Sequence, residues 1–307
     1  MTLHETLSGA RARLVAEGLS HEGASVDVDL YARTILGWDR ARLLSELHGG
    51  APERLEPTLS EWIVRRARRE PSAYIVCVRE FWGLDFAVTP AVLIPRPETE
   101  FIVEEALSLL RSMNLTASGG RAAGGGPESA RVRVADVGTG SGCVAVALAA
   151  EMPGFRLTAS DVSREALAVA RGNAARHGVA DRIDFVATSY LDGVDGAFEV
   201  MTANPPYVKD GDKAALSRDV RHEPEVALFG GAEGLRDIGG VLDTATEKLT
   251  PGGWLVMEFG YGQEQSVDTL VEARPALRLD HVRTDLHGIP RTAVIQRVPS
   301  ATTPDFP

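Results

Sequence analysis

The sequence is poor in cysteine, and its two cysteines are far apart. Cys77 and Cys143 form no CxxC pair among the 307 residues. Two isolated cysteines cannot make a disulfide framework or, by themselves, a zinc cluster. Each lies among apolar neighbours, so we expect both to be buried as small hydrophobic side chains, and we expect no bound metal.

Long apolar runs are also missing. No stretch reaches about 18 consecutive apolar residues, the length that a membrane-spanning helix needs. The N-terminus has no basic segment followed by an apolar run, so it does not look like a signal peptide. We therefore expect a cytoplasmic protein with no membrane partner.

Positive charge is in deficit. The formal net charge is −11, so the chain gains no general attraction to a phosphate backbone, and direct binding of nucleic acid is not expected. The basic run at Arg65, Arg66, Arg68 and Arg69 is a local exception. We interpret it as a solvated helix face, with contact to an acidic patch on a partner as the alternative.

The first 75 residues have a helical pattern. Leu3, Leu7 and Leu14 recur at helical spacing with polar residues between them. A second helix is expected to close at Gly37, and Ser60 is a candidate N-cap for a later one. We assign residues 1–75 to a small helical domain; because it has no glycine-rich loop and no acid at nucleotide spacing, we expect it to recognise a substrate rather than to bind a nucleotide.

The character of the chain changes after this region. Residues 74–78 and 86–88 are β-prone, and Gly83 lies between them in a position typical of a turn. We therefore predict that residues 76–97 form a β-hairpin linker. The following residues, 98–299, are assigned to a second and larger domain.

Within the larger domain the pattern alternates between helices and strands. The expected helices cover 98–113, 143–150, 164–177, 240–249 and 263–273, and the expected strands cover 132–137, 156–160, 183–187, 198–203 and 253–258. This alternation predicts an α/β fold whose mostly parallel sheet has helices on both faces.

Three further segments complete the expected architecture. The last two strands, 277–285 and 291–298, are joined by a connection too short for a crossover helix, so they should form an antiparallel hairpin. The glycine- and alanine-rich segment near 117–127 is interpreted as a flexible surface loop. Residues 300–307 are expected to be a disordered tail.

A glycine-rich loop follows the first strand of this domain. The segment Asp136-Val137-Gly138-Thr139-Gly140-Ser141-Gly142 leads into a helix, whose N-terminal amides favour negative groups. Asp161 ends the next strand, where a carboxylate can accept both hydroxyls of a ribose. A tight turn without a ligand is the alternative, but the order of strand, loop, helix, strand and acid favours nucleotide binding. The loop resembles the first motif of class I S-adenosylmethionine-dependent methyltransferases.

A second motif, Asn204-Pro205-Pro206-Tyr207, follows a later strand. The carboxyl ends of strands line the ligand site in open α/β sheets. The prolines remove two donors, which leaves the Asn204 side-chain oxygen and the Pro205 carbonyl as acceptors for an NH₂ group. Tyr207 offers a flat face for a planar substrate. A rigid proline turn is the alternative. The motif resembles that of methyltransferases acting on glutamine amides or on the exocyclic amines of bases.

The chain resembles one such family along most of its length, the HemK/PrmC-type protein glutamine methyltransferases. The matching segments are Phe81–Leu84, Leu93–Glu100, Asn204–Tyr207, Glu223–Leu235, Glu258–Gln263 and Gly288–Arg291. The resemblance implies a Rossmann-like class I methyltransferase domain with a small N-terminal helical domain. It also implies methyl transfer from S-adenosylmethionine to the glutamine amide nitrogen in the Gly-Gly-Gln motif of peptide-chain release factors, which would be the protein partners.

The resemblance assigns roles to single residues. The cofactor would lie against Asp136, Gly138, Thr139, Gly140, Ser141, Gly142, Asp161, Tyr190 and Asn204. The catalytic residues would be Asn204, Pro205 and Tyr207, and these residues together with Pro206 and Arg96 would hold the substrate. Two positions depart from the family pattern: Ser189 stands where an acid is usual, and Cys77 where a glycine is usual.

Two other functions compete with this one. An adenine-N6 or other nucleic-acid methyltransferase could carry the same Asn-Pro-Pro-Tyr motif. The acidic balance and the absence of a basic, aromatic-rich recognition region argue against it. A non-catalytic cofactor-binding module that only docks a translation factor is the other alternative, and the intact Asn204–Tyr207 motif argues against that.

Overall fold

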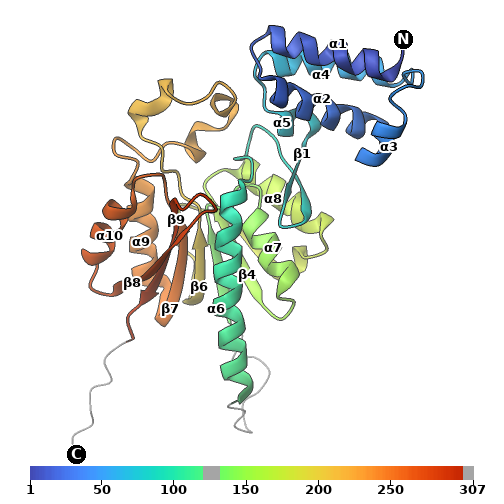
Figure 1. The fold of residues 1–307 in the computed structure, drawn as a ribbon. Helices are drawn as coiled ribbons and strands as arrows, with labels where there is room; N and C mark the ends of the chain where they lie inside the picture. Colours follow the sequence, from blue (N-terminus) through green and yellow to red (C-terminus); the bar gives the residue numbers. More distant parts are fainter. Residues whose placement is uncertain (120–131, 300–307) are drawn as a thin grey trace, which may run out of the picture. The chain divides into compact units, whose positions relative to one another are not determined.

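The computed structural model describes residues 1–119 and 132–299 (Figure 1). The chain divides into two compact units: Met1–Val78 with Ser217–His222, and Arg79–Leu216 with Glu223–Pro307. The smaller unit is called the helical unit below, and the larger one the sheet unit. The predicted tail at 300–307 and most of the predicted loop at 117–127 lie outside the described residues. The first residues of that loop belong to a helix that continues to Gly119.

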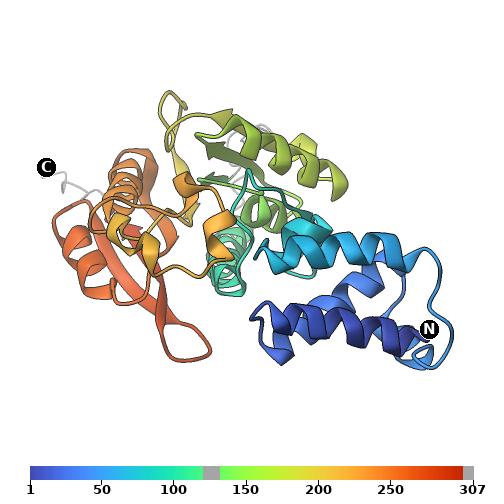
Figure 2. The ribbon, with the colours of Figure 1, turned by 90° about the horizontal axis from the view of Figure 1, so that it is seen from above.

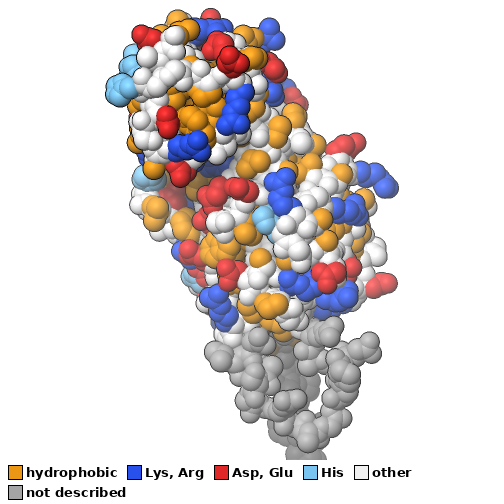
Figure 3. All heavy atoms as spheres, turned by 90° about the vertical axis from the view of Figure 1, so that its right-hand side faces the viewer, with side chains coloured by type: hydrophobic (Ala, Val, Ile, Leu, Met, Phe, Trp, Pro, Cys, Tyr) orange, Lys and Arg blue, Asp and Glu red, His pale blue; other side chains and the backbone are white. Residues whose placement is uncertain are grey.

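The helical unit consists of α-helices (Figure 2), and their buried apolar side chains form one core. The helices are α1 (Leu3–Ala16), α2 (His21–Leu36), α3 (Arg40–Ser45), α4 (Leu55–Ala67) and α5 (Ser72–Val76). Thr2 and Glu5 form a capping box at the start of α1. Gly37 ends α2 in a left-handed conformation with φ 64°, as the sequence predicts. Figure 3 shows a group of hydrophobic side chains on one face of this unit, with acidic and basic residues around it.

Two sequence predictions for this unit are wrong. Ser60 lies inside α4 rather than at its N-cap, and its hydroxyl donates a hydrogen bond to Glu56 one turn earlier. Residues 74–76, read as β-prone, belong to the helix α5, in which the adjacent Tyr74 and Ile75 are both buried. Tertiary burial outweighs the β-propensity of these residues.

The basic run is not a solvated helix face. Arg65 pairs with Glu70 at 2.6 Å. The buried Arg66 donates to Asp27 and also pairs with Asp219, which belongs to the 217–222 segment of the helical unit. The guanidinium of Arg69 caps the carbonyls of Glu17 and Gly18. Arg68 is the exposed member of the run. Arg65, Arg66 and Arg69 are therefore engaged in contacts within the helical unit, and not with solvent or a partner as the sequence pattern suggested.

A short hairpin follows the helical unit. Strands β1 (Val78–Phe81) and β2 (Leu84–Ala87) are joined by Trp82 and Gly83, whose φ angles of 56° and 68° are those of a two-residue turn. Phe81 and Phe86 are fully buried in the core of the sheet unit. The hairpin is thus fixed to that core by two aromatic side chains.

The sheet unit is built on a seven-stranded sheet of order β5-β4-β3-β6-β7-β9-β8. The strands are β3 (Arg133–Val137), β4 (Arg156–Asp161), β5 (Ile183–Ala187), β6 (Phe198–Ala203), β7 (Leu249–Glu258), β8 (Leu277–Thr284) and β9 (Pro290–Arg297). The first five pair in parallel, and β8 and β9 pair antiparallel, as predicted. This is a class I methyltransferase fold accompanied by an N-terminal helical unit.

Helices cover both faces of the sheet. They are α6 (Glu100–Gly119), α7 (Cys143–Glu151), α8 (Arg164–Arg176), α9 (Arg236–Lys248) and α10 (Glu264–Glu272). Alternate residues of each strand face opposite layers: Val134 packs with α6 and α7, and Ala135 with α9 and α10. Helix α9 begins four residues before the predicted 240, because Ile238 already belongs to its buried stripe.

The two cysteines have different environments. Cys143 is buried, as predicted, in the first turn of α7. Cys77 is exposed, so the expectation that it is buried is wrong. It ends α5 in a left-handed conformation with φ 59°, which directs its side chain away from the core and suits the glycine usual there. No helix in 1–119 and 132–299 is long and apolar enough to cross a membrane.

Candidate active site

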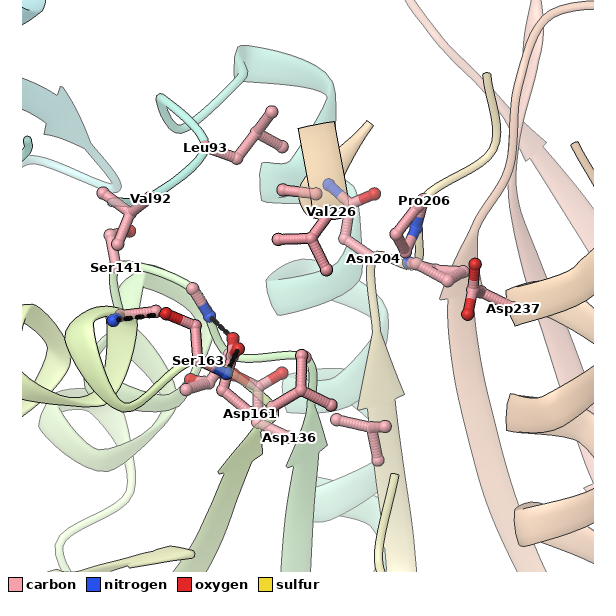
Figure 4. A pocket seen from close by; sticks show the side chains of 18 of the residues that line it. Val92, Leu93, Asp136, Ser141, Asp161, Ser163, Asn204, Pro206, Val226 and Asp237 are labelled. Carbon is pink, nitrogen blue, oxygen red and sulfur yellow. Dashed lines mark hydrogen bonds between the residues drawn. The ribbon is translucent and has the colours of Figure 1, made fainter. Parts of the chain in front are cut away.

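A cavity lies at the carboxyl ends of β3, β4 and β6 in the sheet unit (Figure 4). The labelled Asp161 and Asn204 enter it from two different strands. Nearly all the residues assigned from the sequence line it: Arg96, Asp136, Gly138–Ser141, Asp161, Tyr190 and Asn204–Pro206. Tyr207 and Gly142 are absent from its lining.

The glycine-rich loop forms one wall of the cavity. Gly138, Gly140 and Gly142 all have left-handed φ angles, of 71°, 55° and 81°. A Cβ atom at Gly138 or Gly140 would meet no protein atom within 4 Å, so the loop leaves open space beside its backbone. A Cβ at Gly142 would instead lie 3.0 Å from Cβ of Ala170 in α8. Two glycines therefore provide room for a ligand, and the third lets two helices approach.

The two aspartates of this wall do different things. Asp136 is buried beneath the loop, where it accepts hydrogen bonds from the hydroxyls of Thr139 at 2.6 Å and Thr202 at 2.8 Å. Asp161 accepts from the amides of Gly140 and Ser163, each at 2.9 Å, and also lines the cavity. Burial raises the pKa of both carboxyl groups. Asp136 thus supports the loop, and Asp161 carries a carboxylate edge toward the cavity.

The Asn204-Pro205-Pro206-Tyr207 motif forms the facing part of the site at the end of β6. The Asn204 side-chain nitrogen donates to the hydroxyl of Thr99 at 3.0 Å. Tyr207 points its hydroxyl to Glu258 at 3.2 Å, within the sheet unit. Because its ring packs in the apolar core under α9, Tyr207 stands behind the motif rather than on the described cavity wall.

A second segment packs directly behind this motif. A Cβ at Gly230 would lie 2.4 Å from the carbonyl oxygen of Pro206, and a Cβ at Gly234 would lie 2.2 Å from that of Tyr207. The side-chain amide of Gln263 donates to the carbonyls of Tyr207 and Gly234. Only glycine allows this backbone-to-backbone approach, which fixes the position of the motif.

Tyr190 forms another side of the cavity, next to Thr188 and Ser189. Its φ is 49°, and its hydroxyl donates to Asp237 at 3.1 Å. A Cβ at Gly240 of α9 would lie 2.2 Å from the Tyr190 ring, so the ring rests against a glycine. Burial raises the pKa of the Tyr190 hydroxyl to about 12. The ring is therefore neutral and held in place on the side of the cavity where we expected Tyr190 to contact the cofactor.

Arg96 also reaches the cavity. Its guanidinium pairs with Glu223, whose side chain is 1 % exposed. The other oxygen of Glu223 accepts the backbone amide of Ile94 at 3.0 Å. One buried carboxylate thereby fixes both ends of the Ile94-Pro95-Arg96 connector. In the sequence, Glu223 stood out only as the first residue of the matching segment Glu223–Leu235.

The sequence reasoning missed several residues that support the site. Asn173 is fully buried in α8; its side chain donates to the carbonyls of Ser141 and Ala87 and accepts the amide of Ala87. Thr99 and Glu258 connect to Asn204 and Tyr207. For Glu258, the available signal was a charged residue directly after the apolar run 254–257. Within the described ranges, no group of three or more His, Cys, Asp or Glu residues could hold a metal ion.

Comparison with known proteins agrees with this architecture. Residues 127–231 match the family model of the methyltransferase small domain, and residues 5–76 match that of the PrmC N-terminal domain. The hMettl16 catalytic domain, from human, has the same fold, with a TM-score of 0.55 at 16% identity over 76% of this chain and 82% of that one.

Two relatives are similar over most of their length. The release factor glutamine methyltransferase of Bradyrhizobium diazoefficiens is 38% identical over 96% of each chain. That of Nitratidesulfovibrio vulgaris is 42% identical over 78% of this chain and 76% of its own. With this identity over nearly the whole length, and with both the sheet fold and the N-terminal helical unit present, the chain belongs to the family of release factor glutamine methyltransferases.

Proposed function

We propose that this protein transfers a methyl group from S-adenosylmethionine to the side-chain amide nitrogen of a glutamine, the one in the Gly-Gly-Gln motif of a peptide-chain release factor. The observation that carries the proposal is that two groups of residues line the same cavity. The acceptor pair of Asn204 and Pro205 stands in the same cavity as the glycine-rich loop and Asp161.

The glycine-rich wall suits the cofactor. Open space lies beside Gly138 and Gly140. It would let the methionine part of the cofactor place its carboxylate against the loop backbone and the N-terminus of α7. Asp161 would hold the ribose hydroxyls, and Tyr190, beside Thr188, would lie along the adenine. The bound cofactor supplies an electrophilic methyl group on a sulfonium.

The motif at the end of β6 suits an amide nitrogen. The lone pair of an amide is delocalised into its carbonyl, so the nitrogen is a weak nucleophile. Asn204 Oδ1 and the Pro205 carbonyl would accept its two hydrogens and stabilise the positive charge that develops as the nitrogen attacks. The two prolines stiffen this pair and so reduce its reorganisation.

The helical unit is proposed as the part that recognises the protein substrate. It matches the PrmC N-terminal domain model, and it holds no glycine-rich loop of its own. Binding energy from contacts remote from the reacting amide could then be used to orient a poor nucleophile. Because the proposed partner acts in translation, we place the protein in the cytoplasm.

One assay tests the proposal against its rivals. Labelled S-adenosylmethionine is offered to the protein with a release factor, DNA or RNA in parallel reactions, and mass spectrometry locates the added methyl. We expect one methyl on the Gly-Gly-Gln amide nitrogen. Label on adenine, or on a residue other than glutamine, would overturn the proposal.

A variant tests the role of Asn204 in the same assay. Asn204→Ala should lower kcat by a factor on the order of 10²–10³, as for the loss of one transition-state hydrogen-bond partner. The affinity for the cofactor should change much less. Near-normal turnover in this variant would contradict the acceptor-pair mechanism.

A further inference from the structure

The orientation of the Asn204 amide decides whether the proposed chemistry can work. An asparagine side chain ends in an acceptor oxygen and a donor NH₂ group, which exchange places when the amide flips. The amide nitrogen of a glutamine substrate brings two hydrogens and needs acceptors. If Asn204 turned its own NH₂ group into the cavity, this donor would face the NH₂ group of the substrate, which is also a donor, and no hydrogen bond could form between them.

A chain of hydrogen bonds runs from Asn204 into the protein interior. The Asn204 nitrogen donates to Thr99 Oγ1 at 3.0 Å, and the Thr99 hydroxyl donates to Glu258 Oε2 at 2.7 Å. The second oxygen of Glu258 accepts from the Tyr207 hydroxyl at 3.2 Å. Thr99 is 3 % exposed and Glu258 2 %, so water does not compete for these bonds.

The polarity of this chain is set at its buried end. Burial raises the pKa of Glu258, but in its ionised form the carboxylate has only acceptors, and its two oxygens face the hydroxyls of Thr99 and Tyr207. The single hydroxyl hydrogen of Thr99 is used on Glu258, so toward Asn204 the hydroxyl oxygen can only accept. Asn204 must then present its nitrogen to Thr99, which leaves Oδ1 on the other side of the amide.

We propose that Thr99 and Glu258 are positioning residues, which lock the Asn204 amide with its oxygen toward the substrate amide. This inference rests on the proposed function and adds a specific role for two residues that act through Asn204. The order of the elements fits this role, because Thr99 precedes α6 and Glu258 ends β7, the parallel neighbour of β6.

The main test removes the Thr99 hydroxyl without changing the shape of the side chain. Thr99→Val should lower kcat on the release factor by about 10²-fold, since it frees the amide to flip. The KM for the release factor and the Kd for S-adenosylmethionine should stay within about twofold. Thr99→Ser keeps the hydroxyl and should restore most of kcat.

A matched control separates positioning from general destabilisation. Thr158 is a buried threonine of β4, two strands away from β6 in the sheet. Thr158→Val should leave kcat alone, and denaturant unfolding measures the stability of both variants. If Thr158→Val and Thr99→Val lower kcat equally, the loss reflects loosened packing and the proposal is wrong.

Double variants test whether both residues act through Asn204. In an Asn204→Ala background, Thr99→Val should cause no further loss of kcat, since the amide it orients is gone. Glu258→Gln, which can donate an N–H to Thr99 and reverse the chain, should lower kcat on its own but not in that background. Additive losses would overturn the inference.

The outcomes distinguish this inference from the proposed function. If the unaltered protein fails to methylate glutamine, the proposed function itself is wrong. If it methylates glutamine and Thr99→Val retains normal kcat, only the positioning role is wrong.

Discussion

The close backbone approach behind the Asn204–Tyr207 motif leads to a prediction at Gly234. This residue has φ +69°, and a Cβ there would lie 2.2 Å from the carbonyl oxygen of Tyr207. An ordinary contact begins near 3.4 Å, so Gly234→Ala forces the motif and the Gly234 backbone apart by about 1 Å. A displacement of this size in a catalytic group can cost about 10²-fold in rate. We therefore expect kcat to fall by about that factor.

Gly262 provides the matched control for this change. Its φ is +76°, so alanine meets the same left-handed penalty, about 1–2 kcal/mol, but a Cβ there would have no atom within 4 Å. Both variants should lose stability for the shared backbone reason. Gly234→Ala should lose a further 1–3 kcal/mol or so from overpacking, and only it should lose turnover.

The assay compares the two variants directly. Single-turnover methyl transfer to a release factor measures the chemical step, and denaturant unfolding measures the stability of each variant. If Gly234→Ala and Gly262→Ala have equal single-turnover rates while both are folded, the backing role of the 230–234 segment is refuted.

Three shorter predictions concern the cofactor wall and the two thiols. Asp161→Asn should weaken S-adenosylmethionine binding by roughly 1.5–3 kcal/mol in calorimetry, because hydrogen bonds to a charged acceptor are lost. Asp184→Asn, at an exposed position, should leave the affinity unchanged. Unchanged affinity in Asp161→Asn would remove Asp161 from the site. Iodoacetamide at pH 8 should modify the exposed Cys77 and spare Cys143, since burial raises the pKa of Cys143 to about 12; equal labelling in mass spectrometry would contradict this. Cys77→Gly should stabilise the protein by about 1 kcal/mol in denaturant unfolding, as glycine suits φ 59°, and a destabilised variant would show that the cysteine makes compensating contacts.

The sequence predicted the parts of the site that are encoded locally. The glycine-rich loop of 138–142 needs glycine because its backbone is left-handed, and that requirement is visible without any tertiary contact. Asp161 is recognisable because it ends the strand after this loop. The rigid Asn204–Tyr207 turn is recognisable because prolines fix its backbone. Strand and helix periodicity likewise predicted the sheet and the order of its elements.

The predictions failed where distant partners override local preference. Residues 74–76 have strand propensity, but burial in the helical unit makes them helix α5. The basic run at 65–69 was read as solvated because charge usually is, yet Asp27 and Asp219 meet Arg66 from far along the chain. No window of sequence contains such pairs.

The amino-acid pattern indicated the fold class, the family and the residues that line the cavity. The residues behind them are brought together only by folding. Thr99 and Glu258 are 159 positions apart and meet through one hydrogen bond, and Gly234 lies against Tyr207 only because two loops fold together. A local pattern can specify a turn or a capping residue, because these depend on neighbouring backbone. The direction of donation along a row of buried hydrogen bonds depends on every group that the fold brings to it. It is therefore fixed only when the polypeptide is folded.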